Sequence, residues 1–447
     1  MRTRGGNKWN EEMPGKQEAA DFICECAHGL ENASGLDALM EAIGDAQYVL
    51  LGEASHGTHE YYTWRTHITR RLIAEKNFSF VAVEGDWPDC YRLNRYVKGY
   101  ADAGNSAKEV LQEFNRWPTW MWANWETVAL AEWLHKFNRN QAPGRKAGFY
   151  GLDVYSLWES IEAIIKYLER TDRVAAEAAR KAVRCFDSFG HDEGRSYAQA
   201  AALIPASCEE EVTDLLATVR RGMKHYNTDP EGALNAEQNA VVAVHAEHYY
   251  RTMMKGGISS WNVRDHHMTE TLERLVNFHG TGSKAIVWEH NTHIGDARAT
   301  AMSAGGMVNV GQLLNEKYGS RKVFRVGFGS YSGSVIAGKE WGEKMERMNV
   351  PRAMEGSWEE LLHRTGMTVF YLLTESLKKK HFFREALGHR AIGVVYHPEY
   401  EQHGNYVPSI IPLRYEAFVF IDQTKALHPL HVPASESQVP ETYPWGI

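Results

Sequence analysis

Short apolar runs that alternate with helical patterns are the feature that most constrains how this chain folds. The runs hold four to six apolar residues and end in glycine or a polar residue, as buried strands of a parallel sheet do. They cover 48–53, 78–86, 147–153, 284–291 and 322–329, with later candidates at 367–373, 391–397 and 417–422. Helical spacing separates the early runs at 58–76, 88–100 and 124–140. The alternation predicts an α/β fold with a mainly parallel sheet flanked by helices.

The stretch from 155 to 282 differs because it holds no convincing strand pattern. Turn signals such as NTDPEG and KGGISS separate consecutive helical patterns within it. These helices are expected at about 156–170, 172–188, 208–226, 235–254 and 264–278. We therefore predict three parts: an N-terminal helical segment at 1–45, an α/β core at 46–154 and 283–447, and a large all-helical insertion at 155–282 that packs on the core.

Composition and charge argue against several classes of protein. The formal charge of −8 and the lack of a basic stripe argue against a nucleic-acid partner. No apolar run reaches the length of about 18 residues that a membrane-spanning helix needs. The basic N-terminus is not followed by the apolar segment of a signal peptide. The five scattered cysteines fit reduced thiols better than a disulfide framework, so we expect a cytoplasmic protein with no membrane partner.

Polar side chains follow several of the predicted strands at the point where each strand ends. Because ligands bind beyond the carboxyl ends of parallel strands, these side chains are expected to converge on one site. The residues concerned are Glu53, His56 and His59 after the first strand, Glu84 and Asp86 after the second, Asp153 after the third, His290 and His293 after the fourth, and His397 and Glu399 near the C-terminus.

Each of these residues also has a simpler explanation. Glu53 could cap the following helix, and His56 could be a solvated loop residue. His290 and His293 could lie on an exposed turn. For Asp86 we prefer the structural explanation, a cap on the helix that begins near Pro88. It is the coincidence of several such residues at one sheet edge that favours a site.

One chemistry that fits these residues uses His56 as a general base. A neutral imidazole there takes a proton from water, which attacks a carbonyl carbon. The positive end of the following helix is expected to keep His56 neutral near neutral pH. Glu53 orients the imidazole, as the acid of a catalytic triad does. Arg65, about two turns into the helix, is expected to stabilise an oxyanion or to pair with a carboxylate, and a surface ion pair is the alternative.

A second chemistry uses the same residues as metal ligands. Glu53, His56, Glu84, His290 and His293 together could bind a divalent ion that activates water. The spacing of the two later histidines is not HExxH and no cysteine takes part, so the pattern alone is weak evidence for a metal.

Two other chemistries find little support in the sequence. The chain has no G-x-S-x-G motif, which argues against a serine nucleophile. The Gly- and Ser-rich stretch 327–334 matches no phosphate-binding pattern and is expected to be a loop lining the cleft. We predict no nucleotide or other cofactor.

Several residues are candidates for substrate contacts. The stretch 114–126 carries four tryptophans, of which Trp120 and Trp122 are expected to form an apolar wall, with packing at the start of a helix as the alternative. Arg264 could reach a substrate oxygen or bind a carboxylate, whereas its neighbour Asp265 is expected to be structural. Glu84 and Asn291, at strand ends, complete the predicted contacts.

Six motifs in this order resemble the erythromycin esterase family: LLGEASHGTHE, FVAVEGDWPD, WPTWMWANWE, GFYGLDVYSL, WNVRDHHMTETL and WEHNTHIGD. The resemblance runs from about Ala46 to Asp422. It implies an α/β core with helical additions, a metal-independent mechanism with a histidine base, and cleavage of the macrolide lactone ring in the antibiotic-inactivating members. Some members carry the label of succinoglycan biosynthesis proteins, which hints at saccharide-related substrates.

Carried over residue by residue, the family histidine base falls on His56 and its glutamate on Glu53. The family arginine falls on Arg65, and the later paired histidines fall on His290 and His293. One departure is Glu289, where the family more often has a small residue before the first of the paired histidines.

The sequence therefore predicts a hydrolase of ester or lactone bonds that acts on a small molecule. Two alternatives stay open. One is a metal-dependent hydrolase built from the same residues. The other is a protein that binds a macrolide-like or saccharide ligand without catalysis.

Overall fold

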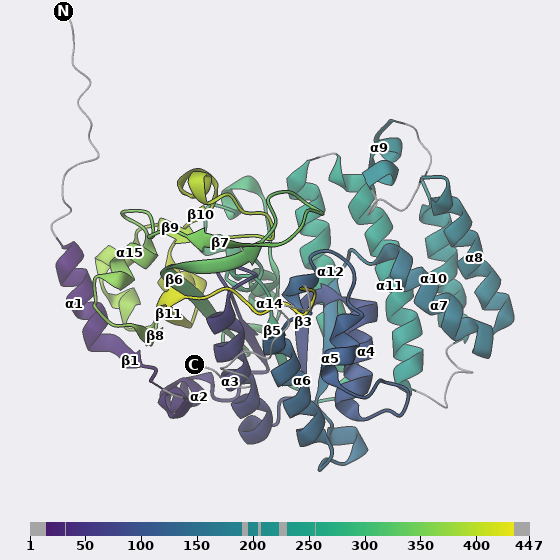
Figure 1. The fold of residues 1–447 in the computed structure, drawn as a ribbon, viewed down its shortest axis with the longest axis horizontal. Coiled ribbons are helices and arrows are strands. Elements are labelled where there is room, and N and C mark those ends of the chain that lie inside the picture. Colours follow the sequence, from purple (N-terminus) through teal and green to yellow (C-terminus); the bar gives the residue numbers. More distant parts are fainter. Residues whose placement is uncertain are drawn as a thin grey trace, which may run out of the picture.

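A mainly parallel sheet forms the centre of the molecule in the computed structural model, which describes residues 15–31, 33–189, 195–203, 207–222, 230–254 and 256–432 (Figure 1). Within these residues the sheet has nine strands, in the order β1-β8-β11-β6-β2-β5-β3-β4, with β7 paired to β6. Their bounds are β1 Ala27–Gly29, β2 Tyr48–Leu51, β3 Phe80–Asp86, β4 Gly148–Asp153, β5 Ala285–Trp288, β6 Val323–Ala337, β7 Glu346–Val350, β8 Val369–Leu373 and β11 Ala417–Thr424. A separate two-stranded sheet pairs β9 Leu387–Arg390 with β10 Tyr406–Ser409.

Strand direction in the main sheet brings the polar strand ends together. The neighbours from β11 through β6, β2, β5 and β3 to β4 are all parallel. The other pairs are antiparallel: β8 pairs with β11, β1 pairs with β8, and β7 pairs with β6. Because β2, β5, β3 and β4 are consecutive neighbours, the residues after them lie at one sheet edge.

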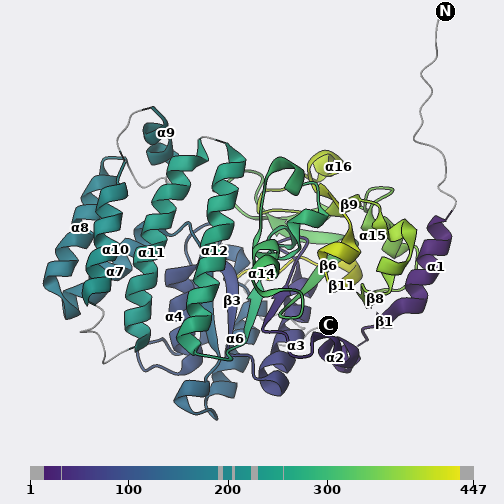
Figure 2. The same cartoon turned by 180° about the vertical axis from the view of Figure 1, so that it is seen from behind.

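Helices cover both faces of this sheet, as the two opposite views show (Figures 1 and 2). One face carries α3 His59–Lys76 and α6 Trp125–Asn138, and the other carries α12 Gly257–His279 and α14 Val310–Tyr318. The remaining helices of the core are α1 Lys16–Cys26, α2 Asp37–Ile43, α4 Trp87–Lys98, α5 Ala107–Gln112, α13 Asn291–Ile294, α15 Trp358–His363, α16 Glu401–Gly404 and α17 Ile411–Arg414. Two buried apolar clusters, one on each face of the sheet, hold the layers together.

Consecutive helices follow β4 and stand beside the sheet (Figure 1). They are α7 Leu157–Thr171, α8 Arg173–Asp187, α9 Arg195–Leu203, α10 Glu209–Gly222 and α11 Pro230–Met253. They share an apolar cluster of their own, and α11 packs on α12, which lies against β4. The prediction of an α/β fold with a mainly parallel sheet and a helical insertion is confirmed. Helix α9 was not predicted. Residues 223–226, the end of the helix predicted at 208–226, lie outside the described residues.

Two segments predicted after the fourth strand are corrected by the structure. Residues 391–397 are not a strand but an irregular segment, with single bridges from Ile392 to Ser55 and from Val395 to Gly338. Residues 327–334 are not a loop but the middle of β6. Their glycines are required by close packing, because a Cβ at Gly327 would lie 2.7 Å from the ring of Tyr415. The loop prediction rested on composition and missed this packing.

The cysteines also differ from the expectation. Cys185 and Cys208 form a disulfide, although 23 positions separate them in the sequence. Cys24, Cys26 and Cys90 are free. The pairing was hidden because α8 and α10 pack against each other, which only the fold reveals. Within the described residues, no helix is both long enough and apolar enough to cross a membrane.

Candidate active site

The loop after β2 presents a glutamate–histidine pair, and an arginine from the next helix holds it. The His56 Nδ1 atom lies 3.0 Å from Glu53 Oε1, and the Arg65 guanidinium donates to Glu53 Oε2 at 2.6 Å. Gly57 lets the loop pass close to β6, because a Cβ there would lie 2.0 Å from the backbone oxygen of Ile336. The loop is therefore held before His56 by the contact of Glu53 with Arg65, and after His56 by the close approach of Gly57 to β6.

Arg65 lies behind this pair rather than in a cavity. It is fully buried, and its guanidinium stacks on the rings of Tyr62 and Trp288 at 4.3 and 4.6 Å. The sequence left three possibilities open for Arg65: contact with an oxyanion, a pair with a carboxylate in the site, and a surface ion pair. In the structure Arg65 is buried and pairs with the carboxylate of Glu53. Its charge offsets that of the buried Glu53.

His56 itself is buried among charges of both signs. Burial lowers the pKa of His56, but the carboxylates of Glu84 and Glu53 outweigh burial, so the pKa is raised above its ordinary value. The expectation of a pKa that favours the neutral imidazole is therefore corrected. The two acids next to His56 stabilise the protonated form more than burial and Arg264 oppose it.

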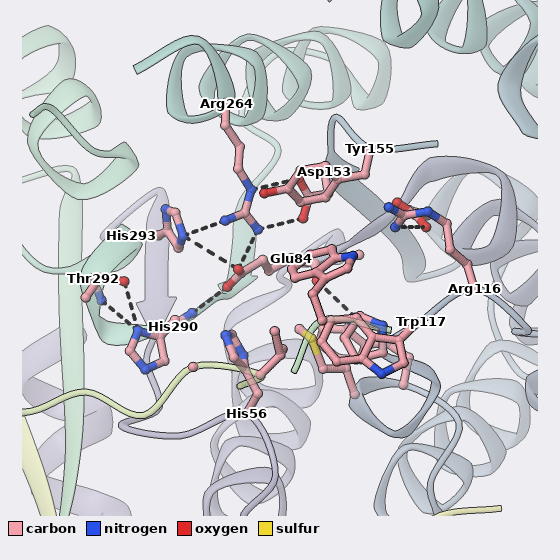
Figure 3. A pocket seen from close by; sticks show the side chains of 18 of the residues that line it. His56, Glu84, Arg116, Trp117, Asp153, Tyr155, Arg264, His290, Thr292 and His293 are labelled. Carbon is pink, nitrogen blue, oxygen red and sulfur yellow. Dashed lines mark hydrogen bonds and ion pairs between the residues drawn. The ribbon is translucent and has the colours of Figure 1, made fainter. Parts of the chain in front are cut away.

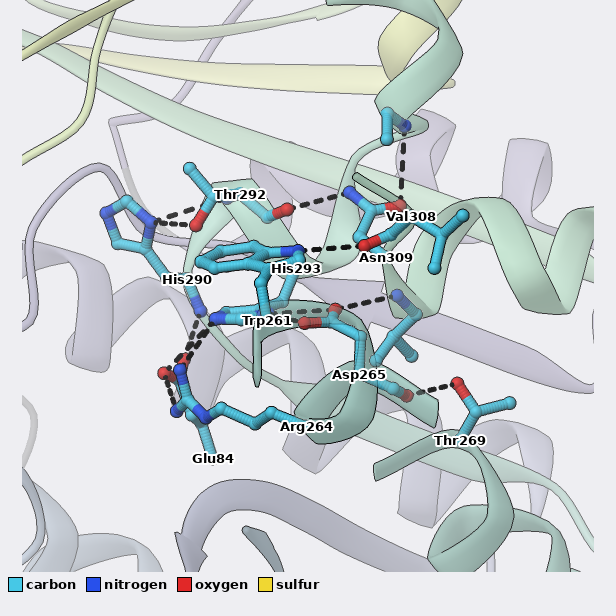
Figure 4. A network of polar contacts seen from close by, with 12 residues as sticks. Glu84, Trp261, Arg264, Asp265, Thr269, His290, Thr292, His293, Val308 and Asn309 are labelled. Atoms are coloured by element: carbon cyan, nitrogen blue, oxygen red, sulfur yellow. Dashed lines mark hydrogen bonds and ion pairs between the residues drawn. The ribbon is translucent and has the colours of Figure 1, made fainter. Parts of the chain in front are cut away.

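A second cluster surrounds Arg264 of α12 (Figures 3 and 4). Its guanidinium donates to both oxygens of Asp153, at 2.9 and 2.7 Å, and to Glu84 Oε1 at 2.6 Å. The other nitrogen of the guanidinium lies 3.1 Å from His293 Nε2. Although burial raises the pKa of Glu84, His293 and Arg264 hold it well below its usual value. Glu84 is therefore an anion in this cluster.

His293 is held in place from the side opposite Arg264. Its Nδ1 lies 2.9 Å from Asp265 Oδ1, and its ring stacks on Trp261 with centroids 4.5 Å apart (Figure 4). Asp265 also accepts a hydrogen bond from the backbone N–H of Val310 at 3.1 Å. The expectation of a structural Asp265 fits this arrangement, in which Asp265 orients His293.

His290 stands between the two clusters. Its backbone N–H donates to Glu84 Oε2 at 2.8 Å, and its ring lies 4.9 Å from the ring of His56, centroid to centroid. Its Nδ1 accepts from the backbone N–H of Thr292 at 3.3 Å, which leaves the proton of a neutral ring on Nε2. Burial and the neighbouring His56 lower the pKa of His290 well below its ordinary value. Among the described residues, no group accepts from this buried Nε2.

A cavity of about 440 Å³ opens in front of these groups (Figure 3). His56, Glu84, Asp153, Arg264, His290 and His293 all line it. Figure 3 shows the imidazole of His56 pointing toward the centre of the cavity beneath Glu84. Apolar side chains also line it, namely Phe114, Trp117, Met121, Trp122, Trp261, Met302, Met307 and Trp341. The cavity therefore offers both charged and aromatic surfaces.

Asp86 and Arg116 form a further ion pair at the cavity, with 3.0 Å between Arg116 and Asp86 Oδ2. Burial outweighs the guanidinium and raises the pKa of Asp86 to about 7. The preferred assignment of Asp86 as a helix cap is corrected, because its side chain makes no cap hydrogen bond at the start of α4. Arg116 was not predicted. Its position within the tryptophan-rich stretch was the only signal for it.

Some predicted contacts lie away from the cavity. The described residues that line it include Trp122 but not Trp120 or Asn291. The Asn291 side chain bonds the backbone of Phe328 in β6 at 2.6 Å. Glu289 is fully buried without a hydrogen-bond partner for its carboxyl oxygens among the described residues. Burial and the nearby Glu84 raise its pKa well above the ordinary value.

His59, His397 and Glu399 are also absent from the described lining of the cavity. His59 faces Glu126 and His428 instead. His397 and Glu399 follow the irregular segment 391–397, so they do not extend a strand of the main sheet. Segment 391–397 nevertheless contributes Ala391, Gly393 and Val394 to the lining.

The fold and the site together define an α/β protein with a cavity lined by acidic, basic and imidazole side chains at the carboxyl edge of its sheet. Comparison with known proteins defines the family more closely. The model of the family described as erythromycin esterase matches residues 73–424. The chain therefore belongs to the erythromycin esterase family, and at the level of class it is an esterase-like hydrolase. Glu53, His56 and Arg65 precede the matched residues.

Individual relatives are distant in sequence. The chain is 22% identical to erythromycin esterase type II of Escherichia coli over 370 residues, which are 76% of this chain and 84% of that protein. A crystal structure of a succinoglycan biosynthesis protein has a TM-score of 0.73 at 20% identity and covers 92% of this chain and 98% of that one. A mutant of the erythromycin esterase EreC in its open conformation has a TM-score of 0.63 at 16% identity, covering 88% of this chain and 94% of that one. At these identities the structures show a shared fold.

Proposed function

We propose that this protein hydrolyses an ester or lactone bond with His56 as the general base. The observation that carries the proposal is the chain of contacts from Arg65 through Glu53 to His56 Nδ1. This chain fixes the ring and assigns a proton to Nδ1, which leaves Nε2 as the atom that can accept a proton. The histidine lines a cavity that has room for an organic substrate.

In the proposed reaction, His56 Nε2 takes a proton from a water molecule while the water oxygen attacks the carbonyl carbon of the substrate. Glu53 stabilises the imidazolium that forms. When the tetrahedral intermediate collapses, the C–O bond to the leaving alkoxide breaks. His56 returns the proton to that alkoxide, which yields a carboxylic acid and an alcohol and restores the neutral base.

The oxyanion of the intermediate needs a hydrogen-bond donor, and we assign this role to His290. Its Nε2–H is buried, carries no described partner and belongs to a ring beside His56. A donor that is already in place and shielded from water stabilises a developing oxyanion strongly. Arg264 is less suited to this role, because Asp153 and Glu84 already engage its guanidinium. We propose that Arg264 and His293 bind polar groups of the substrate.

The lining of the cavity supports a substrate that carries both polar groups and a flat apolar surface. Trp117, Trp122 and Trp261 offer flat apolar surfaces, which suit a macrocycle or the face of a sugar ring. The names of the relatives point to the same two classes, a macrolide in one case and a saccharide in the other. We therefore propose that the substrate is an ester or lactone of one of these classes.

The contacts of Glu84 and Glu53 favour the metal-dependent alternative less, because their carboxylate oxygens already accept hydrogen bonds. Arg264 occupies Glu84 Oε1, and the backbone N–H of His290 occupies Glu84 Oε2. Arg65 and His56 occupy the two oxygens of Glu53 in the same way. A metal at Glu84 or Glu53 would lie beside a buried guanidinium group that competes with it for the carboxylate, so we propose a reaction that proceeds without a metal.

Incubation of the purified protein with panels of esters and lactones, including macrolides and acylated saccharides, tests the proposal. We expect at least one compound to give an acid and an alcohol, which mass spectrometry detects as the addition of one water. Tight binding of such a compound with no product after long incubation would instead identify a binding protein without catalysis.

A further inference from the structure

A second group of histidine and glutamate side chains lies outside the cavity. Its members are His59 at the start of α3, Glu126 at the start of α6 and His428 in the C-terminal segment. The Nδ1 atoms of His59 and His428 lie 2.6 and 2.7 Å from the same oxygen, Glu126 Oε1. Within the part of the chain that the structure describes, this is the one group of three such residues whose possible ligand atoms all lie within 4.8 Å of one another.

The carboxylate of this group is shielded from solvent. The side chain of Glu126 is 5% exposed and that of His59 is 9% exposed, whereas His428 is 38% exposed. The group therefore combines a buried carboxyl group with two imidazoles, and its outer side can be reached from solution through His428.

We propose that His59, Glu126 and His428 bind a zinc-type divalent ion, with water at an open position. Two imidazole nitrogens and one carboxylate oxygen are a ligand set that zinc accepts. In contrast to Glu84 and Glu53, Glu126 has histidines rather than an arginine as its ion-pair partners. Histidine can give up the proton between itself and the carboxylate when a metal binds, and arginine cannot.

Binding requires a small local adjustment. Ligand atoms around a tetrahedral zinc ion lie about 3.3 Å apart for bonds of about 2.0–2.1 Å. The present nitrogen–oxygen separations of 2.6 and 2.7 Å must therefore open by about 0.6–0.7 Å. His428, as the most exposed of the three, can make most of this movement.

We expect a bound ion to hold separate segments of the chain together. The three ligands come from segments that already meet at the loop after β2, which carries His56 and is called the catalytic loop below. The backbone N–H of His59 donates to Lys425 O at 2.8 Å, and the N–H of Leu427 donates to Gly57 O at 3.0 Å. An ion at this site would fasten the C-terminal segment to the loop that carries His56. The site is separate from the proposed reaction, so its test does not depend on finding the substrate.

The test compares zinc binding in the full chain and in two variants after chelator treatment and removal of the chelator. Equilibrium dialysis against zinc chloride with elemental analysis gives the stoichiometry and affinity, and thermal unfolding gives Tm with and without zinc. His428→Ala removes a ligand at a partly exposed position. His431→Ala is the matched control, because His431 lies on the same segment and bonds the backbone of Gln112 instead.

We expect the wild type and His431→Ala to bind one more zinc ion than His428→Ala, and zinc to raise Tm in those two proteins. Loss of a residue that hydrogen-bonds a metal ligand weakens metal binding by about 10–100-fold. Loss of His428, a direct ligand, should weaken zinc binding by more than that. Equal zinc binding and equal Tm shifts in His428→Ala would overturn the proposal. Zinc binding that survives in His428→Ala but disappears in His290→Ala would also overturn it, because the ion would then lie in the catalytic cavity.

Discussion

At the scale of single residues, the charges around His56 set the pH range of the proposed reaction. His56 acts as a base only when it is neutral, so the rate falls as the pH falls through its pKa. The charge of Glu84 raises that pKa, and Glu53 raises it further through its hydrogen bond and its charge. The protein therefore places its base next to an anion that is also needed to hold Arg264.

Replacing Glu84 separates these two roles. Glu84→Gln removes the negative charge and leaves Arg264 less neutralised, and both changes lower the pKa of His56. We expect the acidic limb of the kcat/KM profile to move to lower pH, with a lower maximum because the substrate cluster is disturbed. A pH–rate series on any substrate from the panel measures this. A limb that stays in place or moves to higher pH would contradict the assignment of the limb to His56.

Substitution of Arg65 tests whether its charge stabilises the buried Glu53 that holds His56. Arg65→Met leaves the carboxylate of Glu53 buried without its guanidinium, which should cost about 3–5 kcal/mol of unfolding free energy. In the double variant Arg65→Met/Glu53→Gln no buried charge is left alone, so part of that loss should return, while activity stays low. Denaturant unfolding compares the three proteins. A double variant that is less stable than Arg65→Met would argue against a charge role for Arg65.

At the scale of elements, the close approach of the catalytic loop to β6 determines where His56 lies. A Cβ at Gly57 would lie 2.0 Å from Ile336 O and 2.7 Å from Ile336 N, so Gly57→Ala must move one of the two backbones. A displacement of about 1 Å at a catalytic group can cost about 10²-fold in rate. We expect a loss of kcat of that order, together with a lower Tm.

Gly144→Ala is the matched control for this substitution, because nothing lies within 4 Å of a Cβ placed there. It should keep the wild-type kcat and Tm. If Gly57→Ala has the same kcat as Gly144→Ala, the position of the loop is not critical for the reaction.

Elements also show which parts of the structure the sequence could predict. The strand ends Glu53, Glu84, Asp153 and His290 were predictable, because parallel strands of similar apolar pattern must meet at one edge. The long strand β6 was not, because its glycines have the composition of a loop and only contact with Tyr415 explains them. Arg116 was missed for a related reason, because it lies in an irregular segment without any periodicity, and its ion pair with Asp86 was therefore missed as well.

At the scale of the whole molecule, the site depends on segments that are far apart in the chain. The loop after β2 supplies His56, whereas α12, which follows the insertion helices, supplies Arg264, Asp265 and Trp261. The C-terminal segment 425–430 bonds the catalytic loop through Leu427 and the start of α3 through Lys425. Because these segments close the site from several sides, its geometry is a property of the complete fold.

Chelation distinguishes a metal ion at the group of His59, Glu126 and His428 from a metal ion in the cavity that His56 lines. Without a metal step in the proposed reaction, EDTA treatment should leave kcat unchanged at temperatures well below Tm. Removal of zinc from the group of His59, Glu126 and His428 should lower Tm instead. A loss of kcat on chelation that added metal restores would favour the metal-dependent hydrolase that the residues of the cavity first suggested.

The central claim is that His56 is the general base, and kcat/KM of His56→Ala tests it most directly. We expect a loss of at least about 10²-fold on a substrate that the wild type hydrolyses, with an unchanged Tm and partial rescue by added imidazole. Rescue would mark a missing base rather than a disturbed fold. A His56→Ala protein that hydrolyses the same substrate at the wild-type rate would contradict the account.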